Sequence, residues 1–251
     1  IFGKTINMTS SGKISVGDNS VGIYSNGQYS SLASPTVDLA LGSKIEVSKN
    51  QAVGVFTTGK NQNISSQADI KIGDNSYGYV VKGVGTKLST NSSNPVTVGN
   101  DTVFTYSTDS TGTIENRATL TSTGSKNYGI YAAGRAANLG DISYDSGIGN
   151  VGMYAVSGGR VINGSPTVNS VIKVSASDRT NKLFGIGMAA GYTDDKGVTR
   201  QTGIAENYGT IKTVPNATNT GIVGVVALNG AIIKNYGTIQ VDGSTNTGIY
   251  I

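Results

Sequence analysis

The hydrophobic and polar positions of this chain follow one short pattern that returns along its length. The pattern starts with a stretch in which apolar and polar residues alternate, and it continues with a glycine followed by an apolar pair. Alternation with a period of two predicts a β-strand with one face in a core. We identify nine copies, at 13–27, 44–59, 69–83, 96–107, 119–134, 141–159 and 171–191, and in the two segments that open on NYGTI at 207–211 and 235–239.

The spacing of the copies predicts a coiled architecture. The glycine that opens the second part falls at 22, 54, 78, 129, 152, 185, 221 and 248, with Val103 in its place in the degenerate copy, so copies lie about 23–36 residues apart. A third short strand fits between copies, as at 112–116, 203–207 and 231–235. Three short strands and three turns need roughly 22–25 residues, which is one turn of a three-sided coil. The sequence therefore predicts an all-β fold, a right-handed parallel β-helix (a three-sided β-solenoid) of about nine coils with loop insertions.

The same pattern assigns an inside and an outside to each coil. Ile45 and Val47, and the equivalent pairs in the other copies, point inward, whereas Lys44 and Glu46 point outward. An antiparallel sandwich is the alternative, because Asn-Gly pairs such as Asn26-Gly27 are typical of type I′ hairpin turns. A sandwich gives no reason for one pattern to occur nine times, so the β-helix is favoured.

Composition narrows the chemistry. The chain has no Cys and no His, which excludes disulfides, thiolate metal sites and a Ser-His-Asp triad. Its 19 Lys and Arg residues are scattered, so we predict no nucleic-acid partner. No apolar run approaches the ~20 residues of a transmembrane helix. We predict no catalytic residue, no cofactor and no metal site.

At this point the sequence resembles a known family. NYGTI, IENRATL and GIY, joined by turns rich in Ser, Thr and Asn, resemble the passenger repeats of type V autotransporter adhesins, most closely the large fusobacterial ones. The resemblance implies a surface-exposed stalk on the extracellular side of a Gram-negative outer membrane, anchored by a C-terminal barrel outside these residues. The chain opens on IFGKTINMTS and closes on TGIYI, so we expect 1–251 to be a single β-helix segment, a fragment of a longer passenger.

Aromatic side chains form the first candidate binding surface. They follow the Gly-Ile step and would face outward as a ladder, which we expect to be interrupted at Val80, Gly187 and Val223. Stacked exposed tyrosines bind glycans or protein partners. The alternative is that the rings only pack on one another and shield strand edges. The ladder consists of Tyr24, Phe56, Tyr131, Tyr154 and Tyr250.

Insertions between strands form the second candidate. Surplus residues lie at 26–42, 157–170 and 191–202, and loops on a rigid scaffold often carry binding specificity. The alternative is neutral loop growth. The third insertion is the most polar, and its candidate partner-binding residues are Tyr192, Asp194, Asp195, Lys196 and Arg200.

The sequence favours a non-catalytic adhesin stalk that mediates adherence to host or bacterial cells through a cell-surface protein or glycan receptor. One alternative is a carbohydrate-active β-helix enzyme, a polysaccharide lyase or a glycosidase. A glycosidase would need two carboxylates about 5–10 Å apart on one face. The only adjacent carboxylate pair is Asp194-Asp195, and Lys196 follows it directly. A second alternative is a self-associating aggregation module.

Overall fold

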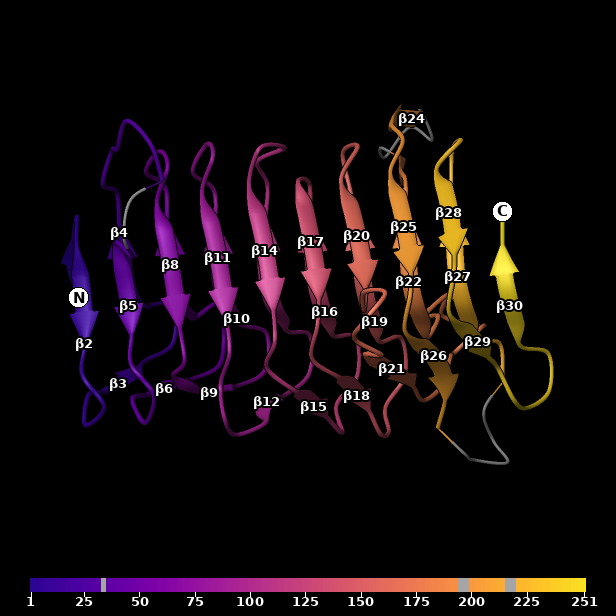
Figure 1. Ribbon diagram of the computed structural model, residues 1–251. Coiled ribbons are helices and arrows are strands. Elements are labelled where there is room, and N and C mark those ends of the chain that lie inside the picture. The colour runs from indigo at the N-terminus through magenta and orange to yellow at the C-terminus, as the bar shows by residue number, and fades with distance from the viewer. Residues whose placement is uncertain (33–34, 194–198, 215–219) are drawn as a thin grey trace.

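The chain winds about one axis as a stack of short strands (Figure 1). The computed structural model describes residues 1–32, 35–193, 199–214 and 220–251, with only the backbone considered at 192–193 and 199–201. Three long parallel sheets contain nearly all of the described strands. No helix that could cross a membrane occurs in this described part.

Each sheet collects every third strand of the stack. Sheet A contains β1 (Phe2–Gly3), β4 (Val21–Ser25), β7 (Val53–Thr57), β10 (Tyr77–Val81), β13 (Val103–Ser107), β16 (Tyr128–Ala132), β19 (Val151–Ala155), β22 (Ile186–Ala190), β27 (Val223–Ala227) and β30 (Thr247–Tyr250). Sheet B contains β2 (Ile6–Met8), β5 (Val37–Leu39), β8 (Asn63–Ser66), β11 (Lys87–Thr90), β14 (Thr113–Asn116), β17 (Arg135–Asn138), β20 (Arg160–Asn163), β25 (Ile204–Asn207) and β28 (Ile232–Asn235). Sheet C contains β3 (Lys13–Val16), β6 (Lys44–Val47), β9 (Asp69–Ile72), β12 (Val96–Val98), β15 (Leu120–Ser122), β18 (Ile142–Tyr144), β21 (Val171–Val174), β26 (Thr210–Thr213) and β29 (Thr238–Gln240).

The pairing confirms the predicted right-handed parallel β-helix. The chain visits sheets A, B and C in turn, and each strand pairs in parallel with its equivalent one coil later. Tyr77 thus lies opposite Val103, and Leu88 opposite Ile114. Because the nearest neighbours of a strand are equivalents of itself, the same residue types are favoured at the same place in every coil. The strand spacing of about 4.8 Å gives a rod roughly 45 Å long.

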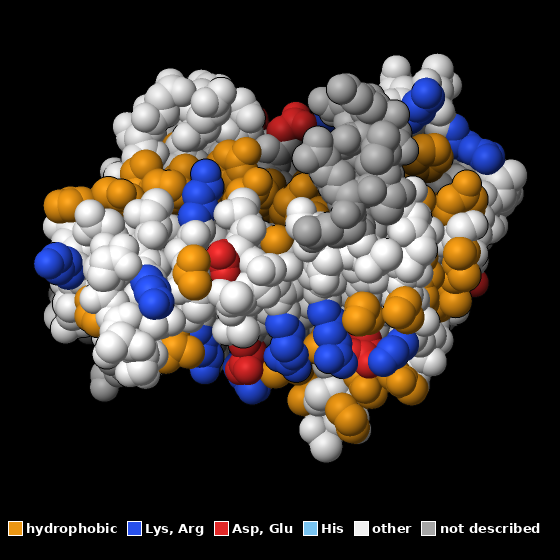
Figure 2. All heavy atoms as spheres, turned by 90° about the horizontal axis from the view of Figure 1, so that it is seen from above, with side chains coloured by type: hydrophobic (Ala, Val, Ile, Leu, Met, Phe, Trp, Pro, Cys, Tyr) orange, Lys and Arg blue, Asp and Glu red, His pale blue; other side chains and the backbone are white. Residues whose placement is uncertain are grey.

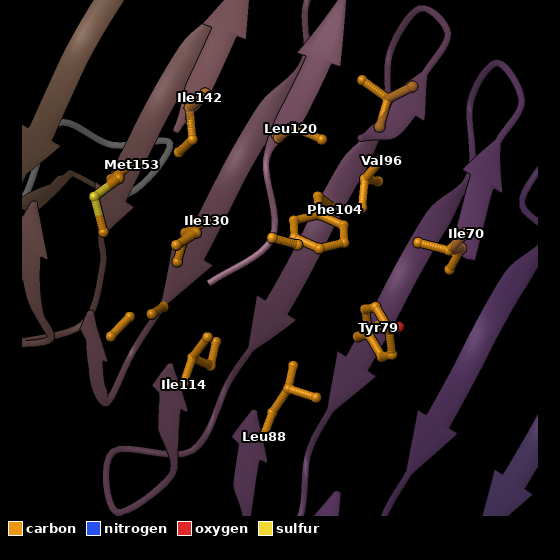
Figure 3. Packing of buried hydrophobic residues seen from close by; sticks show 14 of the residues in the cluster. Ile70, Tyr79, Leu88, Val96, Phe104, Ile114, Leu120, Ile130, Ile142 and Met153 are labelled. Carbon is orange, nitrogen blue, oxygen red and sulfur yellow. The ribbon is translucent and has the colours of Figure 1, made fainter. Parts of the chain in front are cut away.

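The core consists of inward-pointing columns along the axis. Ile45, Ile70 and Ile142 of sheet C are buried at equivalent positions, as the alternating pattern predicts. Leu88 and Ile114 of sheet B meet Tyr79 and Ile130 of sheet A across the interior (Figure 3). Burial of these apolar columns against one another is the main stabilising term of the rod.

The glycine of the repeat fills a position with no room for a side chain. A Cβ on Gly129 would lie 2.5 Å from the carbonyl oxygen of Gly152 and 3.0 Å from Ile142 Cδ1. A side chain at position 129 would therefore point into the core. The next residue, Ile130, is fully buried as well. The strands of sheet A must bend here so that two successive residues face the core.

The register corrects three of the predicted glycine positions. Gly187 and Gly224 occupy the position of Gly152, rather than Gly185 and Gly221, because Val151 pairs with Ile186, which pairs with Val223. In the degenerate copy the position is taken by Phe104 and not by Val103, since Tyr77 pairs with Val103. Where a repeat copy contains more than one glycine, the sequence alone does not show which glycine occupies this position.

The degenerate coil keeps its core filled by exchanging a large and a small residue. Phe104 is buried where other coils have glycine, and Thr105, also buried, stands where they have a larger apolar residue such as Ile130. The Phe104 ring packs edge-on against Tyr79 with centroids 5.7 Å apart. The smaller Thr105 beside Phe104 reduces the overpacking that a ring at the glycine position would cause.

A row of asparagine amides, buried in all but the last coil, links successive coils at the end of sheet B. Asn116 Nδ2 donates to Asn138 Oδ1 over 2.8 Å, and Asn138 Nδ2 donates to Asn163 Oδ1 over 3.1 Å. The row continues through Asn207 to Asn235, with distances of 3.0 and 2.8 Å. Each amide also donates to a backbone carbonyl of its own turn, such as that of Gly140. The row therefore holds the corner between sheets B and C in register.

The insertions differ in part from the predicted ranges. Range 26–42 contains strand β5 and range 157–170 contains strand β20, so the surplus residues of each range are only those outside the strand. Range 191–202 contains an antiparallel pair, β23 (Tyr192–Thr193) and β24 (Thr199–Gln201). A further excursion lies between β21 and β22, closed by an antiparallel bridge between Asp178 and Leu183. The sequence does not indicate this insertion, because its residues lie inside the repeat copy at 171–191.

Candidate functional site

The outer surface of sheet A differs from the other two sides of the rod. We call the two outward columns of its strands the sheet A face. The first column holds Val21, Val53, Tyr77, Val103, Tyr128, Val151, Ile186, Val223 and Thr247. The second column holds Phe2, Tyr24, Phe56, Val80, Tyr106, Tyr131, Tyr154, Ala189, Val226 and Tyr250.

No strand of sheet A, in the described residues, contains a charged side chain. Sheets B and C instead carry outward Lys, Arg, Asp and Glu, for example Lys44 and Glu46. In the view from above, basic side chains gather with acidic ones along the lower border of the molecule (Figure 2). Lys82, which follows β10, is a cation at the rim of the sheet A face, and its ammonium lies 5.7 Å from the Phe56 ring centroid. Charge is thus distributed unevenly around the rod.

The predicted aromatic ladder is present, and it is longer than predicted. Tyr24, Phe56, Tyr131, Tyr154 and Tyr250 share the second column, as expected. Phe2 and Tyr106 also belong to it, and the sequence did not place them because neither follows a glycine and an apolar residue. Interruptions fall at Val80, Ala189 and Val226, so two of the predicted positions, Gly187 and Val223, are corrected with the glycine register.

The rings form two packed groups. Tyr24 stacks between Phe2 and Phe56, with centroid distances of 5.3 and 5.5 Å. Tyr131 stacks on Tyr106 at 5.0 Å, and its edge meets Tyr154 at 5.4 Å. Most of these rings are half-buried by their neighbours, so they present a rigid surface. Burial raises the pKa of Tyr106, with the nearby Tyr77 adding to the effect, so that this hydroxyl stays neutral at physiological pH.

A hollow opens where the second aromatic group ends. Ala189 and Val226 are small, and beyond them Tyr250 restores an aromatic ring. The space between is a cavity of about 440 Å³ whose floor includes Val223 and Val226. Arg179 and Phe184, from the excursion between β21 and β22, form part of its lining. The hollow is large enough for aromatic rings and mostly apolar.

The structure describes only part of the binding site predicted in the third insertion. Asp194, Asp195 and Lys196 lie outside the described residues. Tyr192 lies in β23, opposite Gln201 of β24, and Arg200 lies in β24. Whether these residues bind a partner stays a prediction.

Sheet B carries a second, charged groove that the sequence did not reveal. Glu206 is almost fully buried, and its carboxylate accepts hydrogen bonds from Arg160, one of them 2.9 Å long from Nε. Lys234 Nζ lies 4.0 Å away. Desolvation raises the pKa of Tyr208, and the negative charge of Glu206, to which the tyrosine hydroxyl donates a hydrogen bond, adds to the effect. Because the partners of Glu206 come from three coils, their spacing in sequence gives no motif.

The groove does not bring two carboxylates together. Glu115 lines the same groove of about 260 Å³, but Ala137 and Ile162 separate it from Glu206 in the column. Three strand spacings of about 4.8 Å put the two residues roughly 14 Å apart. Among the residues that the structure describes, no three acidic side chains are grouped so as to hold a metal ion.

The chain was compared with protein families, curated proteins and solved structures. A family model described as the BigA third pectate lyase-like domain matches residues 4–250. Neither a curated protein nor a solved structure matches the chain. The match spans almost the whole chain, and a pectate lyase-like description agrees with the observed β-helix.

Proposed function

Because the chain belongs to the family of BigA third pectate lyase-like domains, we propose that it is a non-catalytic passenger segment of an adhesin on the outer face of a Gram-negative cell. BigA is an autotransporter-like surface adhesin, which supports exposure at the cell surface. In this proposal the rod adheres to host or bacterial cells through a surface protein or glycan. The closer resemblance to fusobacterial adhesins stays a prediction.

The sheet A face is the observation that carries the proposal. Soluble monomers rarely expose a contiguous apolar surface of more than a few hundred Å², and a larger one marks an interaction site. Here two columns of apolar and aromatic residues run from Phe2 to Tyr250 along the rod, and all of them except Val80, Val151, Ala189 and Val226 are at least partly exposed. Their rings are held by stacking and by strands paired on both sides, so little conformational entropy is lost when a partner binds.

The groove on sheet B supports the non-catalytic part of the proposal. The only described carboxylate there with a buried side chain, Glu206, is ion-paired to Arg160. The Glu206 carboxylate already accepts hydrogen bonds from the Arg160 guanidinium, which leaves it less available to a substrate. Glu115, about 14 Å away, is too distant to act with it on one glycosidic bond.

Binding of the purified chain to cells tests the proposal. The assay measures retention of host or bacterial cells on surfaces coated with the chain. Replacing Tyr131 by Glu places a charge in the middle of the sheet A face and should remove most of the retention. The matched control is Tyr236→Glu, since Tyr236 is exposed in the turn between β28 and β29, away from this face.

A catalytic assay addresses the competing function. The chain is incubated with acidic and neutral polysaccharides, and new reducing ends or unsaturated products are measured. We expect no release above that from heat-denatured protein. Release that disappears in Glu206→Gln, with the fold retained by circular dichroism, would contradict the proposal and assign chemistry to the sheet B groove.

A further inference from the structure

We propose that the sheet A face binds the same face of a second copy of this chain, with the two rods antiparallel. The pairing is inferred from the shape of the face alone. Its biological consequence, adherence between cells that carry the same protein, rests on the function proposed above.

The sizes of the side chains along the face carry this inference. A twofold axis that runs along the strand direction between β13 and β16 places the first strand of sheet A opposite the tenth, the second opposite the ninth, and so on. The same axis places each column opposite itself, as expected for an isologous contact. Every strand of one copy therefore meets one defined strand of the other.

Large side chains then meet small ones in the second column. Phe56 lies opposite Ala189, and Tyr24 lies opposite Val226. Val80, the interruption of the first half, lies opposite Tyr154. Tyr24 thus enters the hollow of about 440 Å³ of the partner copy, since Val226 belongs to its lining.

The first column follows the same rule. Tyr77 lies opposite Val151, and Tyr128 lies opposite Val103. Its remaining members near the ridge, Val21 and Val53, are smaller than the aromatic rings beside them. They leave room for Phe184 and Arg179, which rise beside the hollow of the other copy. Large rings face each other only at the axis, where Tyr106 meets Tyr131, and at the rod ends.

A parallel dimer fits less well. In that arrangement the second column of each coil meets the first column of the same coil, so Val226 meets Val223 and Ala189 meets Ile186. The hollow would then face its own small residues and stay unfilled, which loses the dispersion contacts of its lining. The antiparallel arrangement is the one that fills it.

Charge and area agree with a second copy as the occupant. The chain carries a net charge of +4, yet the strands of this face hold no charge that would repel their equivalents. Ten strands about 4.8 Å apart and four residues of about 3.3 Å give a flat footprint of roughly 600 Å² per copy. An interface of standard size takes about 800 Å² from each partner, so we expect a weak dimer with Kd on the order of micromolar.

An exchange of sizes within one chain tests the pairing. Sedimentation velocity over about two decades of concentration gives the dimer Kd of the chain and its variants. Tyr24→Val leaves the hollow unfilled and Val226→Tyr blocks it, because Val226 lines the hollow, so each should weaken the dimer about 10-fold or more. The double variant restores a large–small pair at both symmetric positions and should return Kd to within about threefold of the original.

Cross-linking tests the direction of the rods. The chain has no cysteine, so each single-cysteine variant carries one thiol. Facing sheets lie about 10 Å apart, which suits a short bis-maleimide better than a disulfide. A mixture of Phe2→Cys and Tyr250→Cys chains should cross-link, because these exposed residues face each other. The control mixture, Phe2→Cys with Tyr24→Cys, places the thiols about eight coils apart and should not.

Each result decides one point. A chain that stays monomeric throughout, single variants that leave the dimer intact, or a double variant that dimerises no better than its parents overturns the inference. So does cross-linking in the control mixture, which indicates parallel rods. If cells bind the chain but no dimer forms, the adhesin proposal stands without this partner. If the dimer forms with the expected cross-links but cells do not bind, the pairing stands and the adhesin proposal fails.

Discussion

Replacing Asn138 by Leu tests whether the row of asparagine amides stabilises the rod. Asn138 is fully buried at the end of β17. Its amide accepts a hydrogen bond from Asn116 over 2.8 Å and donates to Asn163 over 3.1 Å and to the Gly140 carbonyl over 2.9 Å. Leucine has a similar shape but can make none of these bonds, so the substitution isolates the polar contribution.

The magnitude follows from the groups left without a partner. One N–H of Asn116, the amide oxygen of Asn163 and the Gly140 carbonyl each lose the bond that Asn138 supplied. A buried polar group without its bond costs about 1–3 kcal/mol, and the apolar leucine offsets part of the sum. We expect the free energy of unfolding to fall by about 3–5 kcal/mol, which for a chain of this length lowers Tm by about 10 °C.

Urea denaturation followed by circular dichroism measures the change. The matched control is Asn235→Leu in the last coil, because Asn235 ends the row and its side chain is exposed. There water replaces the lost bonds, so the cost should stay under about 1 kcal/mol. Equal costs at the two positions, or less than about 1 kcal/mol at Asn138, would refute the view that burial of the row makes it stabilising.

Three further predictions test the core. Gly152→Ala should destabilise the rod by about 2–4 kcal/mol in urea denaturation, because its Cβ would lie 2.5 Å from a backbone oxygen of the next coil; an unchanged midpoint would contradict the close approach. Phe104→Gly should cost about 3–5 kcal/mol, and adding Thr105→Ile should recover part of it, whereas strict additivity would refute the large–small exchange. Burial raises the pKa of Tyr79 to about 12, so ionisation favours the unfolded chain as pH rises from about 10. Tyr79 should lower the free energy of unfolding by about 1 kcal/mol between about pH 9 and pH 11, so Tyr79→Phe should lose about that much less than the original chain over this range.

The sequence was sufficient to predict the architecture for a physical reason. Each strand of the β-helix pairs with its own equivalents, so a residue such as Ile45 or Ile70 reappears wherever the same neighbours recur. The register of the strands is harder to predict from the sequence. A coil requires that its layer of the core is filled, and it does not require one particular residue at each position. Phe104 with Thr105 satisfies that need as well as glycine with isoleucine, and the pattern alone does not distinguish them.

The candidate sites also differ in how far the sequence predicts them. The aromatic ladder was predictable because Tyr131 and Tyr154 occupy one repeat position. The asparagine row has a signal in the sequence, since the third strand of several coils ends in Asn, as in Asn116 and Asn207. The groove around Glu206 had none, because its contacts depend on how many residues each insertion adds between coils.

The direction of the ladder hydrogen bonds has a mechanical consequence. They run along the rod axis and join each coil only to the coils before and after it. A force that pulls the two ends of the rod apart therefore acts on the bonds of the outermost coil first and peels that coil away, instead of shearing the whole stack together. One released coil of about 25 residues supplies roughly 85 Å of slack chain. A stalk of this construction yields to tension in small steps, and each coil can wind back onto the remaining end when the tension falls.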